Sequence, residues 1–499
     1  MASPLLTFFY LSLLGLGLLF AGWEFFLLFQ HLKRSRSAAP STPPSESTGP
    51  LPHVTVQIPL FNERFSAARV IEAVGALDYP DDRLEIQVLD DSTDETREIV
   101  DLAVASLRER GRRAEVVRRS NRLGYKAGAL AHGLSLAKGE LIAIFDADFV
   151  PQPDFLKRLI VSHNAFADPR VGFAQARWQH RNLEANVMTR AQAIMLDRFF
   201  LLVNPVRQSM GFVIQFNGSG GIWRKSCIEE AGGWTADTLT EDFDLSYRAA
   251  LRGWRGVYLP SVGVPCDLPA DLAAFKRQQR RWARGTTQCF VKLIPDLLRA
   301  PWTVGHRWAE IATVAGYHTQ ALVLSMAALW PFFVFLIEPR LLFTATQILF
   351  APLAWAAPIA FFLAHRAREV TPTSRQVRDV VTAIAVSQGL SIAVTAAIAR
   401  AYLTKDAGEF ERTPKRVPQG VRLDSYLVPR DWTVWAEGLA TLYCLGAFVL
   451  IATADGLLWA WPMLLWAASF GFVFLLQVKG PVKGEVEQPE PSLSPSISA

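Results

Sequence analysis

Two kinds of hydrophobic pattern divide the chain. Residues 5–30 and most of 309–477 are long apolar runs, whereas residues 51–300 alternate short apolar runs with polar stretches. A helix needs roughly 20 apolar residues to cross the hydrocarbon core of a bilayer, so the long runs predict membrane-spanning helices. The short runs predict the strands and helices of a water-exposed domain. A chain of 499 residues has room for both parts.

Within 51–300 the pattern predicts strands that alternate with helices. Strands are expected at 54–59, 84–89, 114–117 and from 142 onward, and helices near 64–77, near 94–110 and from about 126. Such alternation indicates right-handed crossovers and a mostly parallel sheet. In sheets of this kind ligands bind at the carboxyl ends of the strands.

Acidic residues stand at two of these strand ends. Asp90 and Asp91 follow the second run, and Asp146 and Asp148 follow the fourth. Alternate side chains of an extended chain point the same way, so Asp146 and Asp148 are expected on one face. Two carboxylates suit a hard divalent cation that completes its shell with water and substrate phosphates. A lone D-x-D also fits a solvated acidic turn, so the other motifs decide.

Three further motifs follow along the chain. They are F-N-G-S-G-G at 216–221, T-E-D at 240–242 and Q-Q-R-R-W at 278–282. Thr240 is expected to cap a helix, with Glu241 and Asp244 as first-turn acids that complement the helix dipole. A basic helix face beside a membrane also accounts for the charges of 275–284, and an interfacial anchor accounts for Trp282.

Taken together, the order D, D-x-D, T-E-D, Q-x-x-R-W resembles that of the processive family-2 glycosyltransferases. Within this group the chain looks most like the cellulose-synthase-like plant mannan and xyloglucan-backbone synthases. The resemblance spans roughly residues 50–480 and rests on the phrases VQIPLFNE (56–63), IQVLDDSTD (86–94), NRLGYKAGAL (121–130), AIFDADF (143–149), AQARW (174–178), FNGSGG (216–221) and EAGGW (230–234). It implies an α/β GT-A catalytic domain with a mostly parallel sheet, joined to an α-helical transmembrane bundle.

The resemblance also implies roles for individual residues. Asp242 is expected as the general base, and Asp146 and Asp148 as ligands of Mg²⁺ or Mn²⁺. The expected nucleotide-sugar-binding residues are Asp90, Asp91, Lys126, Asp146 and Arg281. The expected acceptor-binding residues are Trp282, Gln278, Asn217, Gly218, Thr240 and Glu241. A gating loop over the site is expected to include Phe410, Arg412, Thr413 and Lys415.

The placement of charge orients the membrane segments. A signal peptide carries positive charge before its apolar run, but here Lys33, Arg34 and Arg36 follow it. The positive-inside rule then puts the amino terminus outside and residue 33 onward in the cytosol. If 379–403 crossed the membrane, two basic loops would lie on the wrong side, so it is expected at the interface or as a re-entrant segment, which leaves five crossings. The expected units are a transmembrane anchor (1–36), a linker (37–52), the GT-A domain (53–285), an interfacial helix (286–303), two transmembrane helices (304–378), the segment 379–403, the gating loop (404–432), two transmembrane helices (433–478) and a disordered tail (479–499).

The expected function is that of an inverting transferase. It would polymerise a β-linked, β-1,4 glucan or mannan from UDP-glucose or GDP-mannose on the cytosolic side and translocate it; UDP-N-acetylglucosamine stays open as a donor. The expected partners are the sugar nucleotide, the growing polysaccharide and the lipid bilayer, in the plasma or inner membrane or the Golgi, with any export or periplasmic partner unknown. The chain lacks the interleaved basic and aromatic pattern of a nucleic-acid binder, and its four scattered cysteines favour neither a zinc site nor a disulfide framework. Two alternatives are sugar transfer to a lipid acceptor and an inactive polysaccharide carrier.

Overall fold

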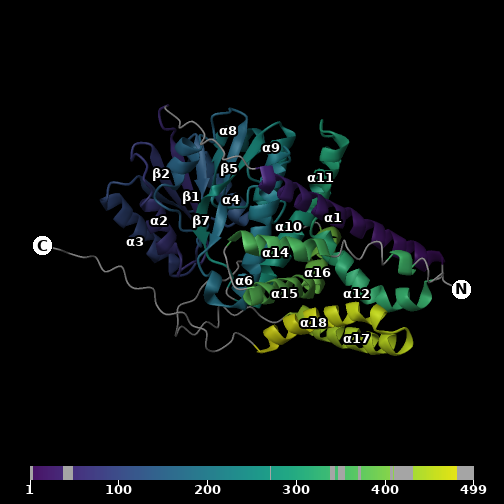
Figure 1. Ribbon diagram of the computed structural model, residues 1–499. Helices are drawn as coiled ribbons and strands as arrows, with labels where there is room; N and C mark the ends of the chain where they lie inside the picture. The colour runs from purple at the N-terminus through teal and green to yellow at the C-terminus, as the bar shows by residue number, and fades with distance from the viewer. Residues whose placement is uncertain are drawn as a thin grey trace.

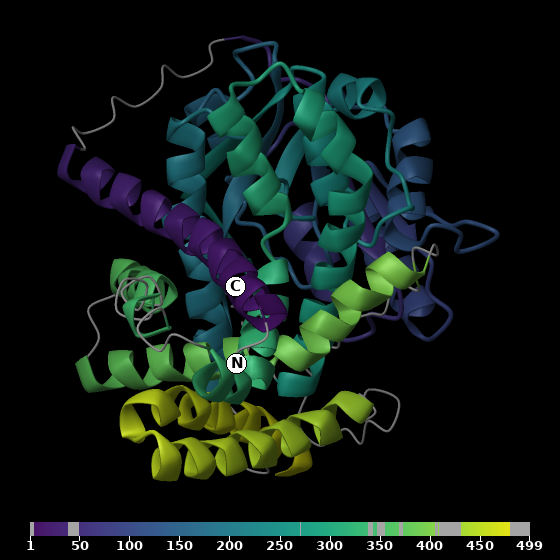
Figure 2. The ribbon, with the colours of Figure 1, turned by 90° about the vertical axis from the view of Figure 1, so that its right-hand side faces the viewer.

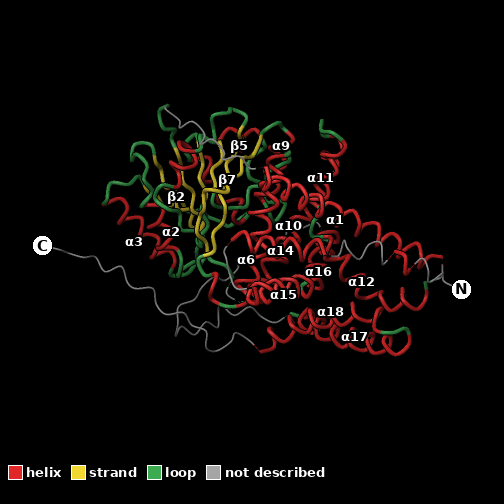
Figure 3. The backbone as a smooth tube through the Cα atoms, in the orientation of Figure 1, coloured by secondary structure: helices red, strands yellow, loops and turns green. Residues whose placement is uncertain are grey.

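The protein has an α/β domain that rests on a set of apolar helices (Figure 1). The computed structural model describes residues 4–37, 49–269, 271–337, 343–346, 355–368, 373–404, 408 and 431–479. All strands lie in the α/β domain, and the rest of the described chain is almost entirely helical (Figure 3).

One seven-stranded mixed sheet forms the centre of the α/β domain. Its order is β3-β2-β1-β4-β6-β5-β7, and only β6 runs antiparallel to its neighbours β4 and β5. The expectation of a mostly parallel sheet is therefore confirmed. The strands are β1 (Val54–Leu60), β2 (Leu84–Asp90), β3 (Ala114–Val117), β4 (Leu141–Ile144), β5 (Val171–His180), β6 (Gly221–Arg224) and β7 (Arg255–Cys266).

Helices cover both faces of this sheet, which is why its strands are apolar on both sides. Val70 of α2 and Val104 of α3 pack with Val56 and Ile86 in one core. Leu130 of α4 packs against the opposite face in a second core. The helices of this domain are α2 (Ala67–Gly75), α3 (Thr96–Glu109), α4 (Tyr125–Leu136), α5 (Phe155–Lys157), η1 (Arg158–Ser162), η2 (Leu183–Ala185), α6 (Val187–Asp197), η3 (Arg198–Val203), α7 (Asn204–Ser209), α8 (Lys225–Glu230), α9 (Glu241–Leu251) and α10 (Leu272–Arg299).

The strand directions bring several motifs to one edge of the sheet. β1, β2 and β4 are parallel, with Leu60 opposite Asp90 and Gln57 opposite Ile144, so Asp90 and the D-x-D motif emerge at the same edge. Because β6 is antiparallel to β4 and begins at this edge, the glycine-rich segment before it arrives there too. One pocket can therefore be built from segments far apart in the sequence.

Most of the helical part lies beneath the α/β domain, with the α17–α18 hairpin as its outer layer and α1 crossing its flank (Figure 2), whereas α11 stands beside the domain (Figure 1). Its helices are α1 (Pro4–Ser37), α11 (Val304–Val314), α12 (His318–Leu336), α14 (Ala356–Arg368), α15 (Thr373–Gly389), α16 (Ser391–Leu403), α17 (Trp432–Ala454) and α18 (Leu457–Lys479). Among the described residues, α1, α12, α17 and α18 are long and apolar enough to cross a membrane.

Two boundaries of this part differ from the sequence-based expectation. The expectation of a separate helix over 286–303 is wrong, because α10 continues without a break to Arg299 despite the internal Pro295. The apolar stretch from 310 is also divided, because α11 ends at Val314 and α12 begins only at His318. The candidate membrane span therefore begins at His318 and does not include α11.

The segment 379–403 folds as the end of α15 followed by α16. The two helices meet at Leu390 with a bend of 40°, which suits a broken span or a re-entrant loop, and counting them as one span gives up to five crossings. Its position in a membrane stays a prediction. Most of 341–354, of the linker 37–52 and of the loop 404–432, and nearly all of the tail 479–499, lie outside the described residues.

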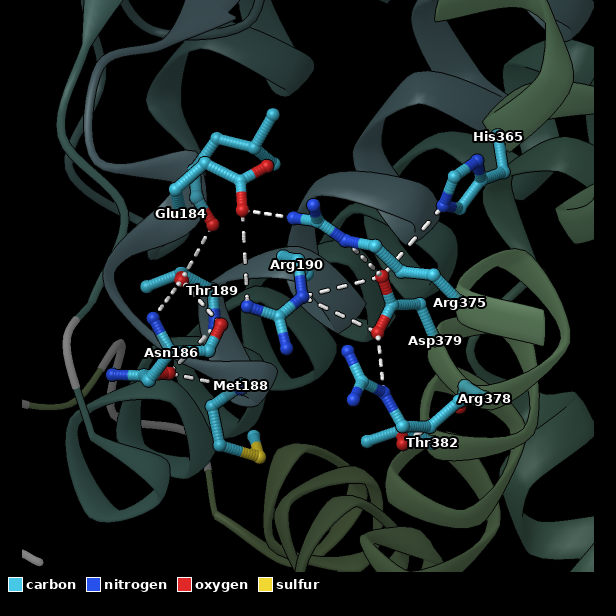
Figure 4. Close-up of polar contacts among 11 residues, drawn as sticks. Glu184, Asn186, Met188, Thr189, Arg190, His365, Arg375, Arg378, Asp379 and Thr382 are labelled. Atoms are coloured by element: carbon cyan, nitrogen blue, oxygen red, sulfur yellow. Dashed lines mark hydrogen bonds and ion pairs between the residues drawn. The ribbon is translucent and has the colours of Figure 1, made fainter. Parts of the chain in front are cut away.

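Ion pairs join the two parts. Asp379 of α15 is fully buried, and both of its oxygens lie 3.2 Å from Arg190 Nε of α6 (Figure 4). Arg375, Arg378 and His365 surround the same carboxylate. Four other carboxylates of the described helical part also pair with cations of the α/β domain: Glu24 with Arg198, Glu310 with Arg207, Glu437 with Lys276, and Asp431 with Arg280. In the exposed pair of Glu184 and Arg375, the carboxylate belongs to the α/β domain and the cation to the helical part.

Candidate functional site

The D-x-D motif lies directly after β4, at the edge where the parallel strands end. Asp146 Oδ1 is 2.6 Å from Lys126 Nζ, and the backbone N–H of Asp146 donates to Ser219 Oγ at 2.9 Å. Asp148 is 8% exposed and the Asp146 side chain is 32% exposed, so Asp148 is buried and Asp146 is partly open to solvent. Burial raises the pKa of the Asp146 carboxyl, and the charge of Asp148 raises it further, against the lowering effect of Lys126.

Lys126 ties three motifs together from the first turn of α4. Besides Asp146, its ammonium donates to the carbonyl oxygen of Gly218 at 3.0 Å and lies 3.7 Å from Glu241 Oε1. Burial lowers the pKa of Lys126, but the charges of Asp146, Glu241 and Asp242 outweigh it and raise the pKa overall. The ammonium therefore stays charged.

Gly218 lies between Lys126 and Asp242 in the glycine-rich turn. Its φ is +77°, and an added Cβ would stand 3.2 Å from Asp242 Oδ2 and 3.4 Å from Lys126 Nζ. A side chain here would be both strained and crowded, so glycine is required for the turn to touch both groups. The neighbouring Asn217 donates its backbone N–H to Gln175 Oε1, and its own Oδ1 is buried with no partner in the described part of the chain.

Asp242 projects from the first turn of α9 and is half-buried. Burial and then the charge of Glu241 raise the pKa of Asp242 to about 7, against the opposing charge of Lys126. A bond network fixes the helix against the glycine-rich turn: Ser246 Oγ donates to the carbonyl oxygen of Asp242 at 2.6 Å and accepts the N–H of Phe216 at 2.9 Å. A carboxyl poised near neutral pH can take a proton from a hydroxyl group.

Thr240 occupies the N-cap position of α9, as expected, but the expected capping hydrogen bond does not form. Its side chain makes no capping hydrogen bond and instead lies 3.4 Å from Cys289 Sγ on α10. The reason is the close approach of α10, where a Cβ on Gly285 would stand 2.6 Å from Thr240 Cγ2. This contact brings the T-E-D and Q-x-x-R-W motifs side by side.

The two acids expected merely to complement the dipole of α9 have partners of their own. Asp244 is fully buried and lies 2.7 Å from Arg248 Nε and 2.9 Å from Lys292 Nζ. Lys292 lies on α10, so Asp244 fixes α9 to that helix. Glu241 is 5% exposed and faces Lys126 in the pocket. Neither acid is a solvated first-turn residue.

The Q-x-x-R-W motif lies on the first half of α10. Burial lowers the pKa of the Arg281 guanidinium, while the charges of Glu241, Asp146, Asp242 and Asp148 raise it, so all four carboxylates lie within electrostatic reach of this arginine. Gln278 is buried and Trp282 is half-buried on the same side of the helix.

Two arginines that sequence reasoning missed hold Asp90 and Asp91. Arg118 Nε donates to Asp90 Oδ2 at 2.9 Å, and Arg119 binds both oxygens of Asp91. Both arginines directly follow β3, whose carboxyl end lies beside that of β2. Their position immediately after an expected strand was the signal that could have revealed them.

The donor set of the pocket fits a divalent cation. The carboxylates of Asp146, Asp148, Glu241 and Asp242 outnumber the two cations among them, Lys126 and Arg281. Among the described residues no group of three or more acidic, histidine or cysteine side chains could hold a metal by itself. Asp146 and Asp148 would therefore share the ion with substrate phosphates and water, as Mg²⁺ and similar ions commonly require.

The structure thus brings together Lys126, Asp146, Asp148, Gly218, Glu241, Asp242 and Arg281, with Asp90 and Asp91 at the neighbouring strand end. The gating-loop residues Phe410, Arg412, Thr413 and Lys415 lie outside the described residues.

The sequence of the α/β domain is similar to that of known transferases. A family model described as "Glycosyltransferase like family 2" matches residues 52–285. Glucomannan 4-beta-mannosyltransferase 1 of Oryza sativa subsp. japonica is 42% identical over 266 residues, which cover 52% of this chain and 50% of that protein. Glucomannan 4-beta-mannosyltransferase 2 of Arabidopsis thaliana is 43% identical over 254 residues, which cover 50% of this chain and 47% of that protein. The chain therefore spans about half the length of the curated relatives it matches.

A solved structure of a mannosyltransferase from Pyrobaculum calidifontis, in complex with GDP-Man and Mn²⁺, is 20% identical to this chain with a TM-score of 0.49, covering 78% of this chain and 99% of that one. This likeness is too distant to carry an argument about ligands. The family match and the plant relatives carry the assignment. Residues 52–285 of this chain are a glycosyltransferase domain of family 2.

Proposed function

We propose that this protein is an inverting, membrane-embedded glycosyltransferase that builds a β-1,4-linked mannan or glucomannan from GDP-mannose. The observation that carries the proposal is the convergence of Lys126, Asp146, Asp242 and Arg281 in one pocket, within a domain 42% identical to a glucomannan 4-beta-mannosyltransferase. UDP-glucose remains the second donor to test.

Asp242 would act as the general base. The acceptor hydroxyl gives its proton to this carboxylate while its oxygen forms the new bond to the anomeric carbon of the donor, and the sugar–diphosphate bond breaks on the opposite side. A single displacement inverts the anomeric carbon, so an α-linked donor gives a β-linked product. No second carboxylate is needed as a nucleophile, in contrast with retaining glycosidases. The raised pKa of Asp242 suits this role, since a base works best near the operating pH.

Lys126 and Arg281 would bind the diphosphate and offset its negative charge as the bond breaks. Asp146 and Asp148 would hold Mg²⁺ or Mn²⁺, which as a Lewis acid stabilises the charge on the leaving diphosphate. Asp90 and Asp91, fixed by Arg118 and Arg119, would contact the base and ribose. Trp282 and Gln278, together with Asn217, Gly218, Thr240 and Glu241, would bind the acceptor end of the glycan.

The apolar helices support synthesis at a membrane. Four described helices are long and apolar enough to cross it, and α10 joins the pocket directly to this part of the molecule. We place the catalytic domain in the cytosol, where sugar nucleotides are available, because Lys33 and Arg34 follow the first apolar helix. The product would leave through the helical part.

The test uses membranes that contain the full chain. With radiolabelled GDP-mannose and a divalent cation, we expect an ethanol-insoluble product that an endo-β-mannanase digests. The Asp242→Asn protein, matched for the amount of folded protein, should lose about 10²–10⁴-fold in rate. Label recovered only in an organic extract would instead indicate transfer to a lipid acceptor. Release of UDP from UDP-glucose, with no turnover of GDP-mannose, would overturn the assignment of the donor.

A further inference from the structure

Helix α10 presents two different faces. Gln278, Arg281, Trp282 and Gly285 recur at the spacing of one helix face, and this face meets the pocket through the contact of Gly285 with Thr240. Lys276, Arg280 and Arg284 follow each other at intervals of four residues and form a separate basic face. The pocket acids Glu241 and Asp146 act on Arg281, which belongs to the first face.

The basic face contacts the helical part of the molecule. Lys276 Nζ lies 2.7 Å from Glu437 Oε1 of α17 and donates to Gln477 Oε1 of α18 at 3.1 Å. Gln477 Nε2 donates in turn to Glu437 Oε2 at 2.7 Å. The side chains of Lys276 and Glu437 are 4% and 0% exposed, so the pair is closed off from water.

Two further contacts extend along this face. Arg280 pairs with Asp431, which caps the first turn of α17 through the backbone N–H of Thr433. Arg284 donates to Thr404 Oγ1, just after α16, at 3.1 Å. Three successive turns of α10 are therefore tied to three different places in the helical part.

A buried ion pair of this kind specifies position more than it adds stability. The desolvation of both charges offsets much of their attraction, so apolar side chains of the same size would hold the hairpin equally well. Apolar contacts would, however, tolerate sliding of α10 along the hairpin. A slip of one helical turn would move Arg281 and Trp282 by about 5.4 Å relative to Asp242. Because Lys276 and Glu437 can pair in only one relative position of their helices, the pair allows a single register of α10 against the hairpin.

We propose that the Lys276–Glu437 pair, supported by Asp431, is a positioning element that holds the substrate face of α10 in register with Asp242. Lys276, Glu437 and Asp431 touch neither the T-E-D motif nor the D-x-D motif in the contacts described above. They act through α10, and the rate of sugar transfer therefore depends on how the α17–α18 hairpin is docked. This inference rests on the proposed function and adds a dependence of that function on the hairpin.

The test compares Glu437→Gln, Lys276→Met and the charge-exchanged protein K276E/E437K in the full chain, in membranes. Rates are expressed per folded molecule, counted as monodisperse protein after detergent extraction. We expect each single variant to lose about tenfold or more in kcat, because Lys276→Met leaves the buried Glu437 without its cation and Glu437→Gln leaves Lys276 only the more distant Asp431, at 3.9 Å. The donor KM should change less than kcat, since Asp91, Lys126 and Asp146 lie on or beside the sheet and only Arg281 of the proposed donor-binding residues lies on α10. The exchanged protein should recover to within about fivefold of the parent, because it restores the ion pair.

Two further variants keep the test decisive. Asp431→Asn retains an oxygen that can cap α17 but removes the charge that pairs with Arg280, so it should fold and still lose about threefold or more in kcat. Lys157→Met is the control, because Lys157 pairs with Asp78 in an exposed pair far from α10, and its kcat should stay at the parent value. If all these variants kept the parent kcat per folded molecule, or if activity fell only with the amount of folded protein, the positioning role would be wrong. Activity of the parent would still support the proposed function, so the two failures are separable.

Discussion

Gly285 on α10 lies so close to Thr240 at the start of α9 that a Cβ would stand 2.6 Å from Thr240 Cγ2 and 2.9 Å from the Thr240 backbone nitrogen. This approach sets the distance between the helix that carries Asp242 and the helix that carries Arg281 and Trp282. The absence of a side chain at one position thus determines how two distant motifs meet.

Gly285→Ala should therefore separate the two helices and lower the transfer rate by about tenfold or more. Overpacking of this kind commonly costs about 1–3 kcal/mol, and here the strain would fall on the helix that carries Asp242, the proposed base. Gly305→Ala is the matched control, since nothing lies within 4 Å of the Cβ it would add. Steady-state rates in membranes with equal amounts of folded protein test this. An active Gly285→Ala enzyme would show that the close approach is not needed.

The pH dependence should report the raised pKa of Asp242. Because this carboxyl has a pKa of about 7 and is the base that we propose, kcat/KM should fall as the pH decreases through about 7. The charge of Glu241 contributes to raising this pKa, so Glu241→Gln should move the acidic limb of the profile to lower pH. Profiles of kcat/KM from pH 5 to 9 for the two proteins measure the shift. A limb that stays in place would mean that another group controls the rate.

Ionisation of Asp242 should also lower the stability of the folded protein at high pH. Its pKa in the folded protein, about 7, lies above the ordinary value of 3.8, so ionisation favours the unfolded state increasingly between these two values and fully above them. Asp242→Asn removes this cost, and its Tm should rise more at pH 8 than at pH 5. Thermal unfolding of the purified protein at both pH values tests the difference. Asp154→Asn, which alters an exposed carboxylate, serves as the control and should change the Tm at neither pH.

Removal of divalent cations should abolish transfer, and Mn²⁺ or Mg²⁺ should restore it. Asp148→Asn should raise the Mn²⁺ concentration that restores half-maximal activity by about tenfold or more, since it removes one of the two carboxylate ligands that we propose. Glu241→Gln is the comparison, because it removes a nearby negative charge without removing an expected ligand. Equal shifts in both variants would indicate a general electrostatic effect in place of coordination. Metal titrations of activity in chelator-treated membranes distinguish these outcomes.

The local patterns predicted those parts of the site that depend on neighbours in sequence. Asp146 and Asp148 could be placed because a short apolar run ends just before them, and strand ends of a parallel sheet share an edge. The continuation of α10 past residue 286 could not be predicted in this way. The change from charged to apolar residues there suggested a boundary, although no local signal ends the helix. Arg119 and Gly285 were missed for a different reason. Their roles depend on Asp91 and Thr240, which the fold brings near them from distant positions in the chain.

The late position of α10 in the chain has a consequence for biosynthesis. The strands that bear Asp90 and Asp146 emerge from the ribosome early, and α10 follows only after the T-E-D helix. The partners of its basic face, Asp431 and Glu437, are made about 150 residues later still. A nascent chain can therefore fold the part of the site at the strand ends long before the part on α10 has a fixed position. On the proposed positioning role, sugar transfer would begin only when the α17–α18 hairpin has been made and has docked against α10, so an unfinished chain would be inactive.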